Sequence, residues 1–335
     1  MSITSARVKE LLQHFQRQRI LVVGDLMLDR YIYGAVSRIS PEAPVPVIHV
    51  QHEKAMPGGA SNVATNLRAL GGQVALGGLL GRDAAGRELR EVLIKNGIST
   101  EAILDQPEIR TIVKSRIIAE RQQVCRVDWE EPLRLDPPTL DGFCKRIAVE
   151  LKKSTGAILA DYGKGVLQQR VVDGVLASAR VGGFPVGLDP KNFSLQLAGL
   201  TLATPNRKEA FAAAGRPETT PAAEPLRDRA LLEVGQLLLQ QWQPRLLLVT
   251  LGAQGMLLFT ADAPPHHVPT RAREVFDVSG AGDTVIATCV LALAAGATPV
   301  EAAEVANFAA GVVVGKLGTA TCNPAELLDA VAGHE

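Results

Sequence analysis

The chain has 335 residues, of which 47% are hydrophobic, so it can bury a large core in one α/β domain or in two smaller ones. Lysine plus arginine and aspartate plus glutamate both total 35, which gives a formal net charge of zero. This balance favours neither a nucleic acid nor an anionic membrane as the main partner, and any cationic site must be local.

Cysteine usage and the N-terminal segment indicate the compartment. Four scattered cysteines lack Cys-x-x-Cys spacing, which argues against a disulfide framework or a zinc cluster and favours a reducing environment. Residues 1–19 alternate apolar and charged side chains like an amphipathic helix and lack the apolar centre of a signal peptide. No apolar run reaches the roughly 18 to 20 residues of a membrane span. We therefore expect a cytoplasmic protein.

Short apolar runs rich in β-formers recur along the chain and predict buried strands. They lie at 20–23, 74–76, 157–160, 186–188 and 246–249. Helical patterns separate most of them, at 60–70, 84–95, 139–153, 168–180 and 225–241. The alternation predicts an α/β fold, with a central, mainly parallel sheet flanked by helices on both faces.

Two stretches, at about 30–56 and 109–131, interrupt this alternation with further strand-like patterns. Pro44 and Pro46 suit an edge strand or a bulge, because proline cannot donate to a strand ladder. We predict that the two stretches form a small antiparallel sheet that stands off the main one as a lid. Both belong to a single domain that spans residues 1–335.

A glycine-rich turn at 277–284, Asp-Val-Ser-Gly-Ala-Gly-Asp-Thr, runs into an apolar helical stretch. The backbone N–H groups of Gly280, Ala281 and Gly282 can point at an anion, with the positive end of the helix dipole behind them. Asp283 then lies where a substrate hydroxyl would lose its proton, an arrangement that suits phosphoryl transfer. Alternatively, the turn only joins a loop to a packed helix, because Gly-x-Gly turns are common there.

A second glycine-rich helix entrance precedes residue 63. Gly58 and Gly59 allow a ligand to approach the backbone closely. Asn62 can both donate to and accept from hydroxyls, as a polyol substrate requires. A plain N-cap turn would have the same sequence pattern.

The first strand ends in Gly-Asp25 and is followed by Asp29. Carboxylates at the carboxyl end of a core strand lie where open α/β sheets bind ligands, and these two can hold sugar hydroxyls. Alternatively, Asp25 caps a helix or pairs with Arg30 on the surface.

Two further strand ends combine an acid with an amine, Asp161 with Lys164 and Asp189 with Lys191. Polar residues at one rim of the sheet should converge on one crevice, where the lysines could neutralise a phosphorylated substrate. The alternative for each lysine is a solvated surface position.

Residues 204–209, Thr-Pro-Asn-Arg-Lys-Glu, start another helix. Asn206 and Glu209 lie one helical turn apart and could organise a hydrated Mg²⁺ on nucleotide phosphates. The alternative is a capping arrangement, in which Asn206 binds the N3 amide and Glu209 reaches back. We place Arg207 and Lys208, between them, in the same nucleotide site.

A strand end at Thr250, with Gly252 and Gly255 behind it, is a further candidate wall of a nucleotide site. By itself it is only a turn signal. No G-x-G-x-x-G follows the first strand, so a dinucleotide site has little support.

Four motifs in this order resemble the ribokinase (PfkB-type) carbohydrate kinases. They are Gly58-Gly59 with Asn62, Asn206-x-x-Glu209, Thr250-x-Gly252 and Asp277-x-x-Gly-Ala-Gly-Asp283. The resemblance implies a ribokinase-like central sheet with a small β lid, ATP as the phosphoryl donor, and Mg²⁺.

The resemblance also implies a role for each matching residue. Asp283 would be the base, the amides of residues 280–282 the anion hole, and Asn206 with Glu209 would lie near the metal and phosphates. The nucleotide would be bordered by Thr250, Gly252, Gly255 and Asn307. The sugar would be held by Asp29, Gly58, Gly59 and Asn62. Asp277 and the Ser279 carbonyl match positions that in some members bind a monovalent cation such as K⁺.

Within the family, the chain is most similar to the branch that phosphorylates D-glycero-β-D-manno-heptose 7-phosphate at O1, on the route to ADP-heptose and the lipopolysaccharide core. This rests on residues 25–31, 37–46, 115–116, 122–123, 126–128, 189–191 and 309–319. The substrate phosphate needs cations, for which Arg116, Lys164 and Lys191 are the candidates. Some relatives carry a fused nucleotidyltransferase with an H-x-G-H-type motif, which this sequence lacks, so we expect a stand-alone kinase.

Two rival functions remain at this point. One is a kinase of the same fold that acts on another sugar, such as a fructose phosphate. The other is a non-catalytic nucleotide or sugar sensor, against which the intact Asp283 and glycine turn argue. Exposed edges of the lid strands further predict a homodimer, because unpaired edges invite pairing.

Overall fold

The computed structural model describes residues 3–120, 122–131, 133–272, 275–316 and 318–335. Its largest element is a nine-stranded sheet in the order β13-β12-β11-β10-β9-β8-β1-β4-β5. The strands are β1 (Arg19–Gly24), β4 (Gln73–Gly81), β5 (Ser99–Gln106), β8 (Gly156–Ala160), β9 (Val186–Asp189), β10 (Leu202–Ala203), β11 (Leu246–Thr250), β12 (Met256–Thr260) and β13 (Ala263–Val268). From β11 to β5 every pair is parallel, and only β12 and β13 join antiparallel, so the mainly parallel sheet is confirmed.

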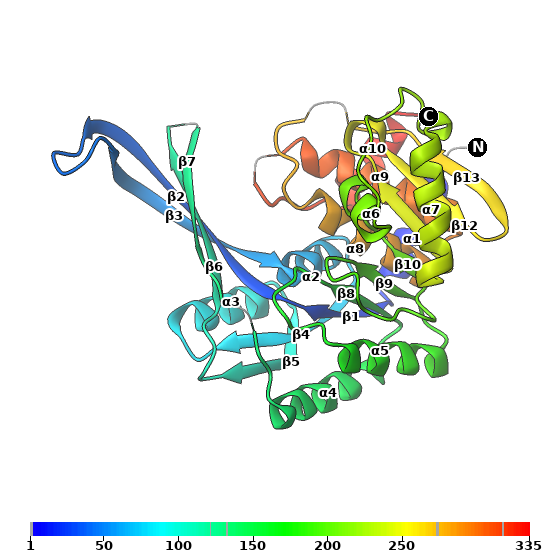
Figure 1. Ribbon diagram of the computed structural model, residues 1–335, viewed down its shortest axis with the longest axis horizontal. Helices are drawn as coiled ribbons and strands as arrows, with labels where there is room; N and C mark the ends of the chain where they lie inside the picture. The colour runs from blue at the N-terminus through cyan, green and yellow to red at the C-terminus, as the bar shows by residue number, and fades with distance from the viewer. Residues whose placement is uncertain (1–2, 121, 132, 273–274, 317) are drawn as a thin grey trace.

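Helices cover both faces of this sheet (Figure 1). One face carries α1 (Ser5–Phe15), α2 (Ala60–Ala69), α3 (Ala84–Lys95), α8 (Ala281–Ala294), α9 (Pro299–Val314) and α10 (Pro324–Ala332). The other carries α4 (Pro137–Leu151), α5 (Gln169–Gly182), α6 (Arg207–Ala213) and α7 (Arg229–Trp242). Because successive strand residues point to opposite faces, Ile20 and Val22 enter the first core, while Leu21 and Val23 enter the second. Burial on both faces explains the continuous apolar runs of the sequence.

The predicted strands and helices are present, with small shifts at their ends. Helix α7 begins at Arg229 instead of residue 225, because Pro225–Arg227 form a separate 3₁₀ turn. The predicted runs do not include β5, β12 or β13, and the two prolines and two histidines of β13 do not resemble a buried strand. They are tolerated because β13 lies at the edge of the sheet. Within the described residues, no helix combines the length and apolarity that crossing a membrane requires.

A second sheet of four strands, here called the small sheet, projects away from the body (Figure 1). It consists of β2 (Leu26–Ile39), β3 (Pro46–Gly59), β6 (Ile112–Ala119) and β7 (Gln122–Trp129), in the order β3-β2-β6-β7. The two outer pairs are antiparallel as predicted, but the central pair β2–β6 is parallel, which corrects the expectation of a wholly antiparallel sheet. The reason is that β2 follows β1 and β6 follows β5, so both strands leave the main sheet in the same direction.

The ends of the central strands lie level with one another at one rim of the main sheet. Gly24 of β1 pairs in register with Ala160 of β8, and Ala160 pairs with Asp189 of β9. The base of the β2–β3 hairpin closes on the same rim, where the Ala60 N–H donates to the Asp25 carbonyl at 3.0 Å. The acidic strand ends therefore meet the start of α2 and the root of the small sheet.

The packing of α7 on β12 gives a test of the fold. A Cβ on Gly235, in the middle of α7, would lie 2.3 Å from the ring of Phe259, whose side chain is fully buried. We expect Gly235→Ala to lower the unfolding free energy by about 1–3 kcal/mol, because overpacking outweighs the gain in helix propensity.

The matched control is Gly174→Ala, in the middle of α5, where an added Cβ has no neighbour within 4 Å. There the propensity gain acts alone, and we expect stabilisation of up to about 1 kcal/mol. Urea unfolding of both variants measures the difference. Equal effects of the two substitutions would contradict the packing described for α7.

Candidate active site

Two helices begin side by side at the rim of the main sheet, and each is preceded by a glycine. Helix α2 begins after Gly59, at φ 57°, and α8 begins after Gly280, at φ 79°. Side chains rarely adopt this left-handed region, so glycine suits both turns. The positive ends of both helix dipoles thus border the same space, which favours an anion there.

Side chains join these two helix starts directly. Asn62 Nδ2 of α2 donates to Asp283 Oδ2 of α8 at 2.6 Å. One turn deeper, the Thr284 hydroxyl donates to Asn66 Oδ1 at 2.8 Å. Gly280 leaves room for the first contact, since a Cβ there would lie 2.8 Å from Asn62 Nδ2. The predicted base and the predicted sugar-binding asparagine are therefore in direct contact.

The other oxygen of Asp283 also has a partner, because the Tyr162 hydroxyl donates to Oδ1 at 2.5 Å. Burial among protein atoms raises the pKa of Asp283, although the hydrogen bonds from Tyr162 and Asn62 and the charge of Lys191 partly offset this, while the charge of Asp29 adds to it. A carboxylate with a raised pKa is a suitable proton acceptor near neutral pH.

The sequence did not predict that Tyr162 contacts Asp283. Tyr162 lies inside the segment 161–164, Asp-Tyr-Gly-Lys, whose acid and amine are candidate substrate residues in the sequence while the tyrosine is not. A hydroxyl that directly follows an acidic strand end was the available signal.

Asp25 neither caps a helix nor pairs with Arg30, which were the alternatives to a sugar contact. Its carboxylate is buried and accepts backbone N–H bonds from Tyr162 at 2.9 Å and from Lys164 and Val166 at 3.1 Å. Burial raises the pKa of Asp25, and these hydrogen bonds act in the opposite direction. Arg30 pairs with a glutamate of α3 instead. Asp25 therefore holds the loop 161–166 in place.

Asp161 has a similar role between two loops. Its Oδ1 accepts the N–H of Gly163 at 2.9 Å, and its Oδ2 accepts those of Lys191 and Asn192 at 2.9 and 2.5 Å. The carboxylate thus binds backbone N–H groups of two loops at the strand ends.

At the root of the small sheet, three predicted substrate residues meet. Arg116 of β6 donates to Asp29 of β2 at 2.8 Å, and its guanidinium lies 5.1 Å from the centre of the Tyr31 ring. Gly58 of β3 faces the same carboxylate, since a Cβ there would lie 2.6 Å from Asp29 Oδ2. Only glycine leaves this space open.

Lys191 connects the acidic strand end to the start of α6. Its Nζ lies 2.6 Å from Glu209 and 3.5 Å from Asp189. Burial, together with the charges of Glu209 and Asp283, raises the pKa of Asp189 to about 7, although Lys191 opposes this.

The capping alternative for Asn206 and Glu209 is present in the structure. Asn206 Oδ1 accepts the Glu209 N–H, and Glu209 Oε2 accepts the Asn206 N–H, both at 2.9 Å. Arg207, expected at the nucleotide, is buried and pairs with Asp228 at 2.8 Å, so its guanidinium connects α6 to the start of α7. Lys208 is exposed.

An apolar cleft of about 280 Å³ brings the predicted nucleotide residues together with the start of α8. Predicted nucleotide and anion-hole residues in its lining are Thr250, Gly252, Gly255, Asn307, Ala281 and Gly282. Apolar side chains supply much of the remaining wall, among them Met256, Val275, Val278, Val285 and Val314. The Ala281 N–H, expected in the anion hole, donates to the Val278 carbonyl at 3.2 Å here.

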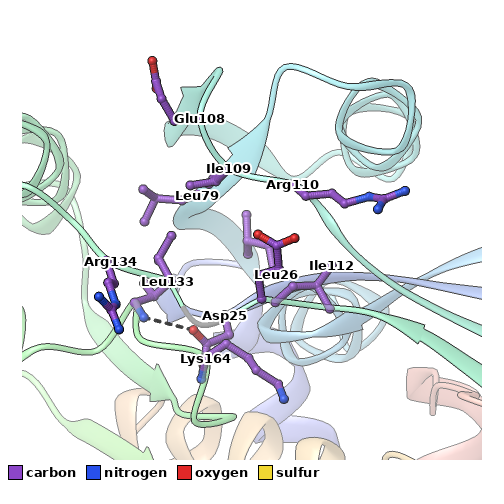
Figure 2. Close-up of a pocket in the computed structure, with 12 residues that line it drawn as sticks. Asp25, Leu26, Leu79, Glu108, Ile109, Arg110, Ile112, Leu133, Arg134 and Lys164 are labelled. Carbon is purple, nitrogen blue, oxygen red and sulfur yellow. Dashed lines mark hydrogen bonds between the residues drawn. The ribbon is translucent and has the colours of Figure 1, made fainter.

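A second pocket lies between the root of the small sheet and the body (Figure 2). Asp25, Leu26, Leu79 and Leu133 line it, and Arg110, Arg134 and Lys164 stand around it. The Leu133 N–H donates to the Lys164 carbonyl at 3.1 Å across one side of this pocket. Asp283 is not among the lining residues of this pocket. The loop 161–166 connects the two, because Lys164 lines the pocket while Tyr162 contacts Asp283.

The predicted cation positions differ in their surroundings. Asp277 accepts the N–H groups of Ser279 at 2.9 Å and Gly318 at 3.0 Å; burial raises its pKa, but these bonds prevail and lower it. Across the described ranges, no group of three or more His, Cys, Asp or Glu side chains could hold a metal by itself. Asn206 and Glu209 carry oxygens of the type that a hydrated Mg²⁺ binds, but both side chains form the capping box and Glu209 also pairs with Lys191.

Comparison with known proteins places these features in a family. A sequence model described as pfkB family carbohydrate kinase matches residues 17–326. The bifunctional protein HldE of Caulobacter vibrioides is 47% identical over 317 residues, which cover 93% of this chain and 63% of that protein. This chain therefore spans less than two thirds of the length of that curated relative.

Two solved structures share the fold at low sequence identity. Phosphofructokinase-2 from Escherichia coli, in complex with potassium, has a TM-score of 0.74 at 20% identity, and the match covers 94% of this chain and 99% of that one. Arabidopsis thaliana ribokinase complexed with ribose and ATP has a TM-score of 0.70 at 19% identity, covering 94% and 98%. The ribokinase-like fold expected from the sequence is confirmed.

Proposed function

Because this chain belongs to the pfkB family of carbohydrate kinases, we propose that it transfers the γ-phosphoryl group of ATP to O1 of D-glycero-β-D-manno-heptose 7-phosphate. The product is the 1,7-bisphosphate, a precursor of ADP-heptose for the lipopolysaccharide core. The observation that carries this proposal is the place of Asp283, which contacts α2 on one side and follows the cleft-lining residues Ala281 and Gly282 on the other.

ATP fits the apolar cleft beside Thr250 and Asn307. The apolar walls of the cleft suit the adenine ring, and the N-terminus of α8 lies at the inner end of the cleft. The γ-phosphate then reaches the N-terminus of α8, where backbone N–H groups and the helix dipole favour negative charge. Mg²⁺ bound through water by Asn206 and Glu209 would neutralise charge on the phosphates. A monovalent cation such as K⁺ at Asp277 and Ser279 belongs to the same proposal.

Asp283 accepts the proton of the anomeric hydroxyl as that oxygen attacks the γ-phosphate. Transfer of this kind depends mostly on positioning and on neutralising charge, so the base acts together with the helix start. Asn62 donates to one oxygen of Asp283 and keeps the carboxylate at the mouth of α8.

The sugar is proposed to lie between this helix start and the root of the small sheet, where Asp29, Gly58 and Arg116 meet. In this reading the small sheet, from about 30–56 and 109–131, is the lid of a single kinase domain. The choice of a heptose phosphate is supported by the family branch that the lid segments resemble, and by likeness to a protein named HldE.

The base assignment predicts the outcome of Asp283→Asn. We expect kcat to fall about 10²-fold or more, because the proton acceptor is lost while the shape of the side chain is kept. ATP affinity, measured by isothermal titration calorimetry, should change little. Asp262→Asn, at an exposed position on the turn before β13, is the matched control and should keep full activity. Near-normal turnover of the Asp283 variant would overturn the assignment.

The substrate is tested by a screen of ADP release over phosphorylated sugars with the wild-type enzyme. Turnover with the heptose 7-phosphate well above that with fructose phosphates supports the proposal. A preference for a fructose phosphate favours the rival kinase, and no sugar-dependent ADP release favours a sensor.

The three candidate cations for the substrate phosphate are already paired with carboxylates in this structure. Lys164 pairs with Glu130 at 2.8 Å, Lys191 with Glu209 and Arg116 with Asp29. We expect alanine at each position to raise KM for the phosphorylated sugar, because a phosphate that exchanges with these carboxylates loses a charged partner. Initial-rate kinetics of the three variants measure this, and unchanged KM values in all three would place the phosphate elsewhere.

We also propose that two copies associate through the small sheet. Among the described residues, the outer strands β3 and β7 each pair on one side only, and several apolar side chains on the sheet are exposed. These are Ile39, Val50, Val124, Val127 and Trp129. Sedimentation should show dimers at micromolar concentration, and lysine at Val50 and Val127 should shift the protein toward monomers. Wild-type monomers at that concentration would contradict the proposal.

A further inference from the structure

We propose that Tyr162 is a positioning residue for the catalytic base, because its hydroxyl fixes the orientation of the Asp283 carboxylate from the side opposite Asn62. This inference rests on the proposed function, in which Asp283 accepts the proton of the sugar hydroxyl. Tyr162 belongs to none of the four sequence motifs and does not line the nucleotide cleft.

The geometry of the two hydrogen bonds carries the proposal. Tyr162 Oη donates to Oδ1 at 2.5 Å and Asn62 Nδ2 donates to Oδ2 at 2.6 Å. The donors come from different elements, the loop after β8 and the first turn of α2. Two donors that hold one oxygen each fix the plane of the carboxylate, whereas a single donor would leave it free to rotate about its last torsion.

Tyr162 is itself held firmly. Its ring packs against the core on the α2 and α8 face. Its backbone N–H binds the buried carboxylate of Asp25, which also holds Lys164 and Val166 of the same loop. Asp161, the residue before it, ties the loop to the backbone at Lys191. The hydroxyl is therefore placed before any substrate arrives, as preorganised catalytic contacts are.

Charges around the pair decide what the hydroxyl does to the base. The groups that face Asp283 and Tyr162 are Asp25, Asp29, Asp189 and Lys191. Burial and the neighbouring carboxylates raise the pKa of Tyr162 well above its ordinary value, so the phenol stays protonated and remains a donor. Its bond favours the ionised form of Asp283 and lowers the pKa of that carboxyl against the effect of burial.

The alternative role for the same contact is a block, in which Tyr162 occupies the oxygen that the sugar hydroxyl needs. Each carboxylate oxygen has two acceptor sites, so Oδ1 or Oδ2 can accept the sugar hydroxyl beside its present donor. The two roles predict opposite results when the hydroxyl is removed. Loss of a positioning contact lowers kcat, and loss of a block raises kcat/KM.

The test is Tyr162→Phe, with the pH profiles of kcat and kcat/KM measured by ADP release using the sugar on which the wild type is active. We expect kcat to fall about 10- to 100-fold at neutral pH, as for loss of a hydrogen bond to a charged group, with KM for ATP unchanged. The acidic limb of the profile should move to higher pH, because the pKa of Asp283 rises without its donor. A merely structural role would not move that limb.

The matched control is Tyr33→Phe, on β2 of the small sheet, where the ring stacks on His52. It should leave the pH profile unchanged. If Tyr162→Phe does not fold, a fluorinated tyrosine at position 162, with a more acidic hydroxyl and the same shape, should move the acidic limb to lower pH. A wild-type profile in the Tyr162 variants, or a rise in kcat/KM, would overturn the inference.

Failure of the proposed function is separable from failure of this inference. If the wild type releases no ADP with any sugar, the kinase proposal is wrong, and the carboxyl ¹³C resonance of Asp283 provides the second readout. That resonance is assigned as the one missing in Asp283→Asn. Tyr162→Phe should raise its titration midpoint, and an unchanged midpoint would overturn the positioning role.

Discussion

The arrangement of the site depends on one hydrogen bond, which Asn62 donates to Asp283. Helix α2 continues directly from β3 of the small sheet, and α8 begins at the inner end of the apolar cleft. A single pair of side chains thus sets where the region proposed for the sugar meets the region proposed for the nucleotide. Because α8 is buried along most of its length, Asp283 stands on a support that packing fixes.

Sequence reasoning identified the main sheet and the convergence of its acidic strand ends, because periodicity and the carboxyl ends of parallel strands follow from local pattern and topology. It could not identify which partner each side chain takes. Asp25 and Asp161 bind backbone N–H groups of a loop whose path only the fold defines, and Arg207 turns toward Asp228. Tyr162 has no diagnostic spacing, and the only signal for it is that its hydroxyl directly follows the acidic strand end at Asp161. The parallel β2–β6 pair likewise follows from the connections through the main sheet and not from either strand.

The cations proposed for the substrate phosphate are already paired with carboxylates. Arg116 and Lys191 are each bound to a carboxylate, and the pKa of Asp189, beside Lys191, is raised to about 7. A phosphorylated substrate would therefore replace one anion by another at each cation. Selectivity then depends on the better geometry of the incoming phosphate more than on net attraction, since the desolvation of paired charges offsets much of the Coulomb gain.

The hairpin of β2 and β3 is anchored at its root, where the Ala60 N–H donates to the Asp25 carbonyl. Asp25 holds the loop that carries Tyr162, and Ala60 starts the helix that carries Asn62, so both donors to Asp283 are connected to that one junction. The two strands of the hairpin run 14 residues each outward from this junction, so the same pair of strands connects the tip of the small sheet to the surroundings of Asp283. A substitution at the tip of the hairpin therefore lies far along the strands from this junction, whereas one at Asp25 or Ala60 acts directly on the support of both donors.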